Sequence, residues 1–434
     1  MINARTFKGA RDFLPEQMLH RERITQIMRN VFKKYGFAPM ETPAIEYLDV
    51  LTGKYGEDAD RLIYKLDYKV GSKDAAALHY DLTVPFSRVV AMNPHLAVPF
   101  KRYQIQPVWR ADRPQPHQGR FREFVQCDCD VVGTSSVIVD AELVAITYEV
   151  LKMLGFNEFV IKINNRKILN GLTQYLGLSP DMTGEVCRSI DKLDKISWDE
   201  VAKELLEKGI SNDAIKTAET LLTKSEISLS YLSRAFSDIP EALEGIQELE
   251  NMFTYLQCMG VDAANYTFDL SLARGLDYYT GPIFETKLPN HPHIGSLTGG
   301  GRYDNLIGTF TGKSMPAVGT TLGLDRIYTA MEQLEMLVAM KTSTQVLVAN
   351  FSEATVVPCL QLVAQLRSIG ICTEFYPEQA KMKKQFAYAD KQNIQYVLIL
   401  GEDELQQGKI SLKDMRTGEQ VIIRFEEIER EINK

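Results

Sequence analysis

The stretch LARGLDYYTGPIFE, residues 272–285, is the most informative part of this chain. It follows a strand-like run and places Arg274, an aspartate and two adjacent tyrosines between glycines. Such a segment supplies a fixed cation and two phenol donors to a pocket, and it offers little to a hydrophobic core. A purely structural pair of Arg274 with Asp277 is the alternative, because ion pairs in ordinary folds also cluster charges.

A second informative segment, residues 98–132, predicts a β-hairpin with a long polar loop at residues 112–119. Strand alternation brings three arginines and one aromatic ring together near the tip of this hairpin. They are Arg110, Arg120, Arg122 and Phe124. Guanidinium groups on rigid strands bind phosphates bidentately, and a ring beside them can stack on a base. The hairpin therefore suits a nucleoside triphosphate. A charged surface hairpin is the alternative, but it does not explain the position of Phe124.

Together these segments resemble the histidyl-tRNA synthetases, a family of class II aminoacyl-tRNA synthetases. Residues 272–285 are similar to the histidine-specific motif of the family, and residues 100–133 resemble class II motif 2. Residues 317–331, AVGTTLGLDRIYTAM, resemble motif 3, and residues 36–46, GFAPMETPAIE, resemble motif 1, which forms the dimer interface in this class. The resemblance implies a homodimeric ligase. It would join L-histidine to tRNA(His) through a histidyl-adenylate made from ATP, releasing pyrophosphate and AMP.

The resemblance also assigns side chains to ATP. They are Arg110, Arg120, Arg122, Phe124 and Arg326. Arg110 would hold the α-phosphate, Phe124 would stack on adenine, and Arg326 would cover the other face of the base and reach the γ-phosphate. Arg274 would lie opposite Arg110 and stabilise the charge that develops on the α-phosphate in the transition state. Both arginines are therefore expected to be catalytic, and Mg²⁺ is expected to accompany the β- and γ-phosphates.

The residues that the resemblance assigns to histidine come from several segments. They are Asp81, Leu82, Thr83, Arg110, Gln126, Asp130, Arg274, Tyr278, Tyr279 and Tyr303. Asp81, Thr83 and Gln126 would receive the α-ammonium group. A neutral imidazole has one donor and one acceptor nitrogen, which Asp130 and Tyr279 would satisfy. A buried polar site of this kind discriminates by up to ~10⁴–10⁵, so no editing domain is expected.

The 434 residues are enough for about three domains of ~150 residues each. Residues 1–167 and 260–340 carry the motifs and would form an α/β (α+β) catalytic domain around an antiparallel sheet. Residues 168–259 are poor in glycine and rich in charged residues and leucine, which predicts a helical insertion. Residues 341–434 alternate strands and helices, which predicts a small α/β domain that resembles an anticodon-binding domain.

Hydrophobic periodicity predicts the main elements inside these domains. Helices are expected over residues 16–35, 82–92, 137–154 and 324–340. In the last ninety residues or so, strands are expected over residues 345–350, 372–376 and 396–400, with helices over 353–369 and 380–392. The triplet at residues 299–301, GGG, lacks the context of a P-loop, and close approach of its backbone to the substrate is the preferred interpretation.

The composition is that of a globular protein, with 45% hydrophobic and 24% charged residues. A net charge of −8 argues against a generic nucleic-acid coat, and DNA is not an expected partner. A local basic surface is nevertheless predicted in residues 100–124, where six bases stand against two acids. The bases are Lys101, Arg102, Arg110, Arg113, Arg120 and Arg122. Six cysteines without a CxxC pair, no apolar run of membrane length and no signal peptide predict a cytoplasmic protein.

Two other functions compete with the ligase. One is a synthetase-like regulatory subunit of ATP phosphoribosyltransferase, which would bind histidine or a partner enzyme without aminoacylation. Such a protein should have lost catalytic arginines, whereas Arg110, Arg274 and Arg326 are all present. The other is a class II synthetase for a different amino acid, which leaves Asp130 and the two adjacent tyrosines unexplained.

Overall fold

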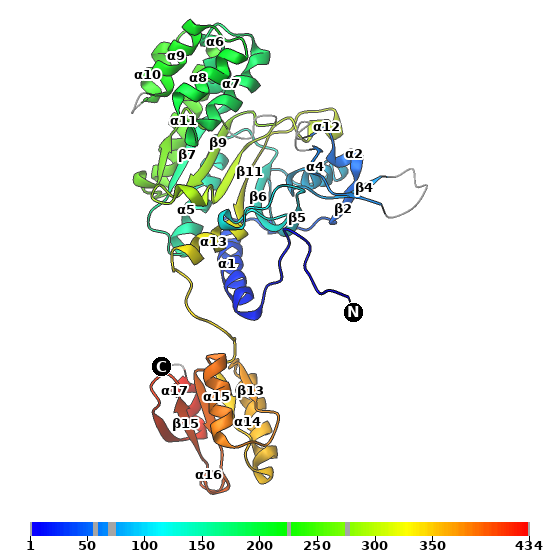
Figure 1. Ribbon diagram of the computed structural model, residues 1–434, viewed down its shortest axis with the longest axis vertical. Coiled ribbons are helices and arrows are strands. Elements are labelled where there is room, and N and C mark those ends of the chain that lie inside the picture. The colour runs from blue at the N-terminus through cyan, green and yellow to red at the C-terminus, as the bar shows by residue number, and fades with distance from the viewer. Residues whose placement is uncertain (1, 55–59, 68–74, 224–226, 274–277, 433–434) are drawn as a thin grey trace. The chain divides into compact units, whose positions relative to one another are not determined.

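The computed structural model describes residues 2–54, 60–67, 75–223, 227–273 and 278–432 (Figure 1). The chain forms two compact units. One comprises Met1–Asp12 and Ile24–Met336, and the other comprises Phe13–Arg23 and Leu337–Lys434. None of the helices in the described ranges is both long and apolar enough to cross a membrane.

An eight-stranded sheet organises the larger unit, in the order β1-β5-β6-β11-β10-β9-β7-β8. The strands are β1 (Ala38–Pro39), β5 (Phe100–Trp109), β6 (Glu123–Val132), β7 (Val160–Asn165), β8 (Tyr266–Phe268), β9 (Pro282–Lys287), β10 (Thr298–Arg302) and β11 (Ala317–Gly323). The six central strands are antiparallel neighbours, and only the short edge strands β1 and β8 pair in parallel. A small sheet of β2 (Ile45–Tyr47), β4 (Ala76–Leu78) and β3 (Lys65–Leu66) belongs to the same unit. The predicted mixed α/β class and the predicted hairpin are confirmed.

Helices flank the large sheet where the hydrophobic pattern places them. They are α4 (Thr83–Met92), α5 (Val137–Met153) and α13 (Leu324–Gln333), and α1 (Pro15–Lys34) precedes the sheet in the chain. Helix α13 was predicted to continue to residue 340, and this prediction is wrong. The helix ends at Gln333, and Glu335 adopts a positive φ of 55°, which a continuing α-helix cannot contain.

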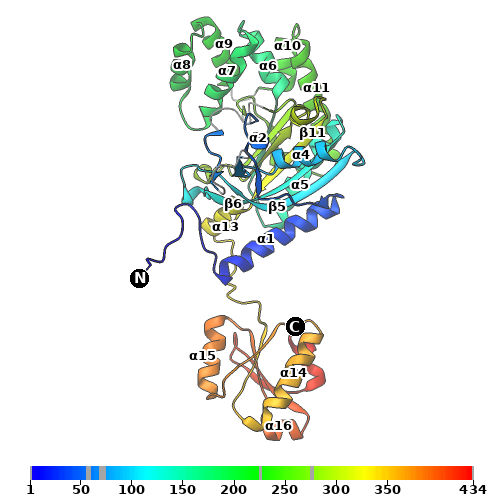
Figure 2. The ribbon, with the colours of Figure 1, turned by 90° about the vertical axis from the view of Figure 1, so that its right-hand side faces the viewer.

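The stretch between β7 and β8 is helical, as its composition predicts (Figure 2). It contains α6 (Arg166–Tyr175), α7 (Thr183–Ile190), α8 (Trp198–Glu207), α9 (Asn212–Leu222), α10 (Leu229–Ala235) and α11 (Pro240–Cys258). Serine caps begin several of these helices, and Ser197 forms a reciprocal capping box with Glu200 at the start of α8. Helix α11 packs on α6, on α5 and on β7, so it joins the helical stretch to the sheet.

The smaller unit has a five-stranded sheet in the order β13-β12-β14-β15-β16. Its strands are β12 (Val346–Val348), β13 (Thr373–Phe375), β14 (Tyr396–Ile399), β15 (Lys409–Asp414) and β16 (Gln420–Arg424), and its helices are α14 (Val356–Ser368), α15 (Met382–Gln392), α16 (Glu402–Gln406) and α17 (Ile428–Ile432). Successive side chains of β12 point to opposite faces of this sheet, and both faces are covered by apolar residues. Val346 and Val348 pack in one apolar cluster with α14, and Leu347 packs in another with α15.

Glycines let the central strands of the larger sheet approach one another. A Cβ atom at Gly300 would collide with the carbonyl oxygen of Gly319 on β11, and a Cβ atom at Gly319 would collide with the carboxylate of Asp130 on β6. The GGG triplet was expected to bring its backbone close to the substrate, and this stays a prediction. The close approach that the structure shows at Gly300 is to the neighbouring strand β11.

Candidate active site

Strand β6 carries three polar side chains on one face. Gln126, Asp128 and Asp130 follow one another at every second residue, and all three are buried. The hydroxyl group of Thr321 donates to Asp128 Oδ1 at 2.6 Å, and the amide of Gln126 donates to the same hydroxyl at 3.1 Å. Gln126 and Asp130 were predicted as site residues, but Asp128 was missed. The sequence contained a signal for it: alternate residues of a strand share a face, so position 128 lies on the same face as 126 and 130.

Gln126, Asp128 and Asp130 are called the acidic row below. One cation faces its two acids from the adjacent strand β5. Arg102 on β5 stands directly opposite Asp130, and its Nη2 lies 2.8 Å from Asp130 Oδ2. Arg102 is fully buried, and its guanidinium carbon lies 4.3 Å from the centre of the Phe86 ring. The prediction that Arg102 belongs to a basic surface is therefore wrong, because an alternating strand turns it inward.

Burial dominates the electrostatics of the row. It raises the pKa of Asp128 to about 7, and it also raises the pKa of Asp130, while the nearby Arg102 lowers the pKa of both carboxyl groups. Asp81 is close enough to raise the pKa of both as well. Three buried acids, Asp81, Asp128 and Asp130, therefore lie with one buried arginine at this site. A ligand that brings a cationic group would stabilise the ionised form of these carboxyl groups.

Three tyrosines line the same region. The Tyr303 hydroxyl donates to Asp130 Oδ1 at 2.6 Å, and burial raises the pKa of Tyr303, which keeps its proton in place for donation. The Tyr278 ring lies 4.6 Å from the Tyr279 ring and 6.2 Å from the Tyr303 ring, between centres. The tyrosines thus form an aromatic wall beside the carboxylate.

The structure joins Arg110 to Gln126 and Phe124 at the hairpin. Arg110 Nη2 donates to Gln126 Oε1 at 3.3 Å, and Arg110 Nε donates to the carbonyl oxygen of Tyr80 at 3.1 Å. Its guanidinium carbon lies 4.3 Å from the centre of the Tyr80 ring and 5.1 Å from that of Phe124. A guanidinium group, two aromatic rings and the acidic row of β6 therefore share one site.

The turn before α4 is attached to this site. Asp81 Oδ1 accepts from the Val84 amide at 3.1 Å and caps the helix start, and the Leu82 carbonyl accepts from Arg102 Nη2 at 3.4 Å. Asp81 and Leu82 are buried, while Thr83 is half-buried at the first residue of α4. Arg274 and Asp277 lie outside the described residues, and no geometry is attached to either.

The remaining arginines assigned to ATP lie around the hairpin tip. Arg326 Nη1 donates to the Ser296 carbonyl at 2.7 Å, and Arg120 Nη1 lies 3.6 Å from Asp112 Oδ2. Arg122 donates to the carbonyl oxygens of Asp112 and Lys8 at 3.0 and 3.2 Å.

Arg122 also lines a cavity of about 800 Å³. The other residues that line this cavity include Lys8, Arg11, Arg113, Pro114 and Phe121. Among the described residues, no group of three or more His, Cys, Asp or Glu side chains could hold a metal ion.

Comparisons with known proteins identify the family of the chain. The family model for histidyl-tRNA synthetase matches residues 9–327, and that for the anticodon binding domain matches residues 345–434. A histidine–tRNA ligase from Cytophaga hutchinsonii is 45% identical over 97% of both chains. A histidine–tRNA ligase from Gloeobacter violaceus is 43% identical over 96% of this chain and 95% of its own.

A solved structure is also similar over the full length. The crystal structure of histidyl-tRNA synthetase from Nostoc sp. PCC 7120 has a TM-score of 0.91 and 35% sequence identity, and the match covers 100% of this chain and 99% of that chain. Family model, curated relatives and fold all give the same assignment. The chain therefore belongs to the histidyl-tRNA synthetase family of class II aminoacyl-tRNA synthetases.

Proposed function

We propose that this chain is a ligase that activates L-histidine with ATP and transfers the histidyl group to tRNA(His). In the first step the histidine carboxylate attacks the α-phosphorus of ATP in line and displaces pyrophosphate. In the second step a hydroxyl group of the terminal adenosine of the tRNA attacks the adenylate and displaces AMP. The observation that carries this proposal is the acidic row on β6, which adjoins Arg110 and Phe124 and faces three tyrosines.

The row and the turn before α4 suit the cationic end of histidine. Asp81 and Gln126 offer acceptor oxygens to the α-ammonium group, with Thr83 beside them, in a pocket whose buried acids outnumber its buried cation. Asp130 already has Arg102 on one oxygen and Tyr303 on the other. A carboxylate has about four acceptor positions, so Asp130 retains capacity for an imidazole N–H. Tyr278 and Tyr279 lie on the aromatic side, where Tyr279 would serve the other ring nitrogen.

The hairpin suits the nucleotide. Arg110 lies beside the rings of Tyr80 and Phe124 and would contact the α-phosphate, which lies next to the attacking carboxylate in the activation step. Phe124 would stack on adenine, and Arg120, Arg122 and Arg326 would contact the remaining ATP groups. Arg274 would stabilise the charge that builds on the α-phosphate, an assignment that depends on the family resemblance. Mg²⁺ would arrive on the β- and γ-phosphates, because it usually keeps phosphate and water ligands.

The wider organisation follows the same family. We propose a cytoplasmic homodimer with catalytic residues 1–167 and 260–340, a helical insertion at 168–259 and an anticodon-binding domain at 341–434. The α/β fold of the last segment and its match to the anticodon-binding model support its assignment. The competing role, a non-catalytic regulatory subunit, has less support because Arg110 is present and positioned beside Gln126.

Amino-acid-dependent ATP–pyrophosphate exchange without tRNA tests the proposal. We expect exchange with histidine alone among the twenty amino acids. We also expect Arg110→Gln to reduce exchange by roughly 10²–10³-fold, because it removes a charge beside the α-phosphate. A folded chain that binds histidine yet exchanges with no amino acid would instead support the regulatory role. Dimerisation is measured separately by sedimentation.

A further inference from the structure

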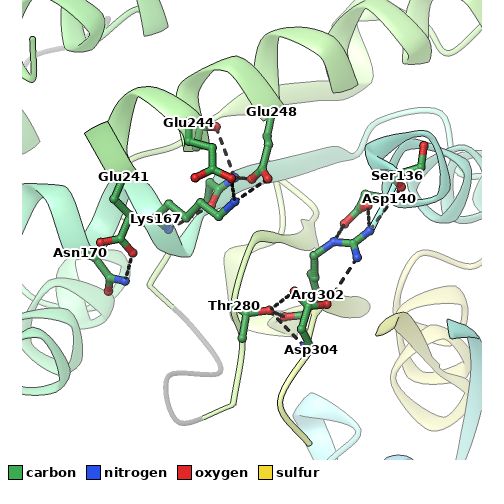
Figure 3. A network of polar contacts seen from close by, with 12 residues as sticks. Ser136, Asp140, Lys167, Asn170, Glu241, Glu244, Glu248, Thr280, Arg302 and Asp304 are labelled. Carbon is green, nitrogen blue, oxygen red and sulfur yellow. Dashed lines mark hydrogen bonds and ion pairs between the residues drawn. The ribbon is translucent and has the colours of Figure 1, made fainter. Parts of the chain in front are cut away.

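The end of strand β10 and the turn after it place three consecutive side chains in two different sets of contacts. Tyr303 points into the pocket and donates to Asp130. Arg302, the last residue of β10, and Asp304, in the turn that follows, contact each other instead, with Arg302 Nη1 3.4 Å from Asp304 Oδ1. One short segment therefore contributes a residue that contacts Asp130 and, beside it, a charged pair. Figure 3 shows the charged pair with Thr280 and Asp140.

The charged pair contacts the residue that follows the two adjacent tyrosines. The Thr280 amide donates to the Arg302 carbonyl at 2.8 Å, and the Thr280 hydroxyl donates to Asp304 Oδ2 at 3.0 Å. The Asp304 amide donates back to the Thr280 hydroxyl at 3.1 Å. Thr280, which directly follows Tyr279, is thus bonded through its backbone amide and through its hydroxyl group, which both donates and accepts.

Arg302 is itself fixed by every donor it has. Its Nε lies 3.2 Å from Asp140 Oδ1, and its Nη2 forms an ion pair with the second oxygen of Asp140, a residue of α5. Its Nη atoms also donate to the carbonyl oxygens of Thr134 and Ser136 at 3.1 and 3.3 Å, besides the contact with Asp304. A guanidinium group has five N–H donors, and these contacts use all of them. Because Arg302 and Asp140 are also buried, Arg302 has no donor left for a substrate.

A second attachment follows one residue later. The Gly281 carbonyl accepts from the Arg166 amide at 2.8 Å, at the first residue of α6. A Cβ atom at Gly281 would lie 3.0 Å from Arg302 Cδ, so the backbone passes close to the arginine stem. The chain that leaves the tyrosine pair is therefore bonded to β10 on one side and to the start of α6 on the other.

We propose that Thr280, Arg302 and Asp304 form a clamp that positions Tyr278 and Tyr279 for histidine activation. These three are positioning residues: they act through the tyrosines and contact no reacting atom. The inference deepens the proposed function and rests on it, because the clamp matters only if the tyrosines receive histidine. A displacement of about 1 Å at a reacting group costs up to about 10²-fold in rate, so a hydroxyl group that fixes the neighbouring residue can have a large effect.

Thr280→Val tests the clamp, because valine keeps the shape of threonine and removes the hydroxyl group with all of its contacts. We expect kcat/KM for histidine in ATP–pyrophosphate exchange to fall by roughly 10–100-fold, with KM for ATP within about threefold of wild type. Thr280→Ser retains the hydroxyl and should restore kcat/KM to within about threefold of wild type. Thr173→Val is the matched control. It removes a buried threonine hydroxyl that donates to the Leu169 carbonyl at 3.2 Å in α6, and exchange should be unchanged.

Three results would overturn the clamp: wild-type exchange in Thr280→Val, equal losses in the valine and serine variants, or a parallel rise in KM for ATP. Asp304→Asn provides a second test that keeps the side-chain shape and weakens the acceptor for Thr280. It should lower kcat/KM for histidine in the same direction as Thr280→Val, and an unchanged value would also count against the clamp. Failure of the proposed function is distinguishable, since the wild-type chain would then show no histidine-dependent exchange at all.

Discussion

The eight-stranded sheet of the larger unit and the five-stranded sheet of the smaller unit bury different kinds of side chain. The central strands β5 and β6 of the larger sheet bury Arg102, Asp128 and Asp130, whereas strands β12 and β14 of the smaller sheet bury valines and leucines. Buried charges cost desolvation free energy that their mutual attraction only partly returns, while buried apolar groups contribute to stability directly. The difference indicates that the eight-stranded sheet gives up stability at the candidate active site.

The largest effect on stability and activity is expected from removal of the buried cation Arg102. Arg102→Met leaves Asp130 and Asp128 buried without their arginine, and a loss of one partner from a buried pair costs about 3–5 kcal/mol. We expect the free energy of unfolding to fall by that amount and histidine-dependent exchange to be lost, since both carboxyl groups then favour the protonated form. Urea unfolding at pH 7 and the exchange assay measure these effects.

The matched control lies in the turn between β15 and β16 of the five-stranded sheet. Arg416→Met also removes an arginine that is paired with an acid, Asp414 at 2.8 Å, but this pair is on the surface. Little change in unfolding or exchange is expected, because solvent screens exposed pairs. Equal destabilisation by the two variants would contradict the distinction between the sheets.

A smaller effect is expected in the pH dependence of the free energy of unfolding, through the buried Asp128. Because burial raises the pKa of Asp128 from 3.8 to about 7, the folded chain keeps a proton that the unfolded chain loses above pH 4. The contribution of this group to stability therefore falls as the pH rises from about 4 to about 7, with a slope of at most about 1.4 kcal/mol per pH unit. Asp128→Asn cannot ionise and should lack this fall. Unfolding of both proteins at pH 5 and pH 8 checks the difference, and parallel pH profiles would refute it.

The smallest effect is expected in the apolar core of the smaller sheet. Ile410 is buried there on β15, and Ile410→Val should lower the free energy of unfolding by about 0.5–1.5 kcal/mol. Exchange without tRNA should remain at the wild-type rate, because no charge of the candidate site changes. A reduced exchange rate in this variant would show that the apolar sheet also shapes the activation site.

The sequence predicted those parts of the fold that depend on local patterns. The hairpin of β5 and β6, helix α5 and the helical stretch between β7 and β8 all follow from periodicities that neighbouring residues carry. The same is true of strand β6 in the site, where Gln126 and Asp130 were placed on one face. Family resemblance added the pairing of the tyrosine motif with the hairpin, which lies far away in the chain.

Sequence reasoning failed where the outcome depends on distant partners. Arg102 sits in a run of basic residues that favours a surface, and only its cross-strand neighbour Asp130 and the Phe86 ring make it a buried residue. Strands β15 and β16 were not predicted, because exposed residues such as Val421 and Ile422 interrupt the usual alternation. The clamp on Thr280 required contacts across more than twenty residues of chain.

The collision that any side chain at position 319 would make with Asp130 has a consequence for how this pocket can evolve. A larger residue at 319 requires a shorter or reoriented side chain at 130, and that change would disturb the contacts with Arg102 and Tyr303. A substitution at position 319 therefore acts on the contacts of Asp130 without being in the candidate site itself. Replacements at 319 that preserve these contacts require a second, compensating change nearby.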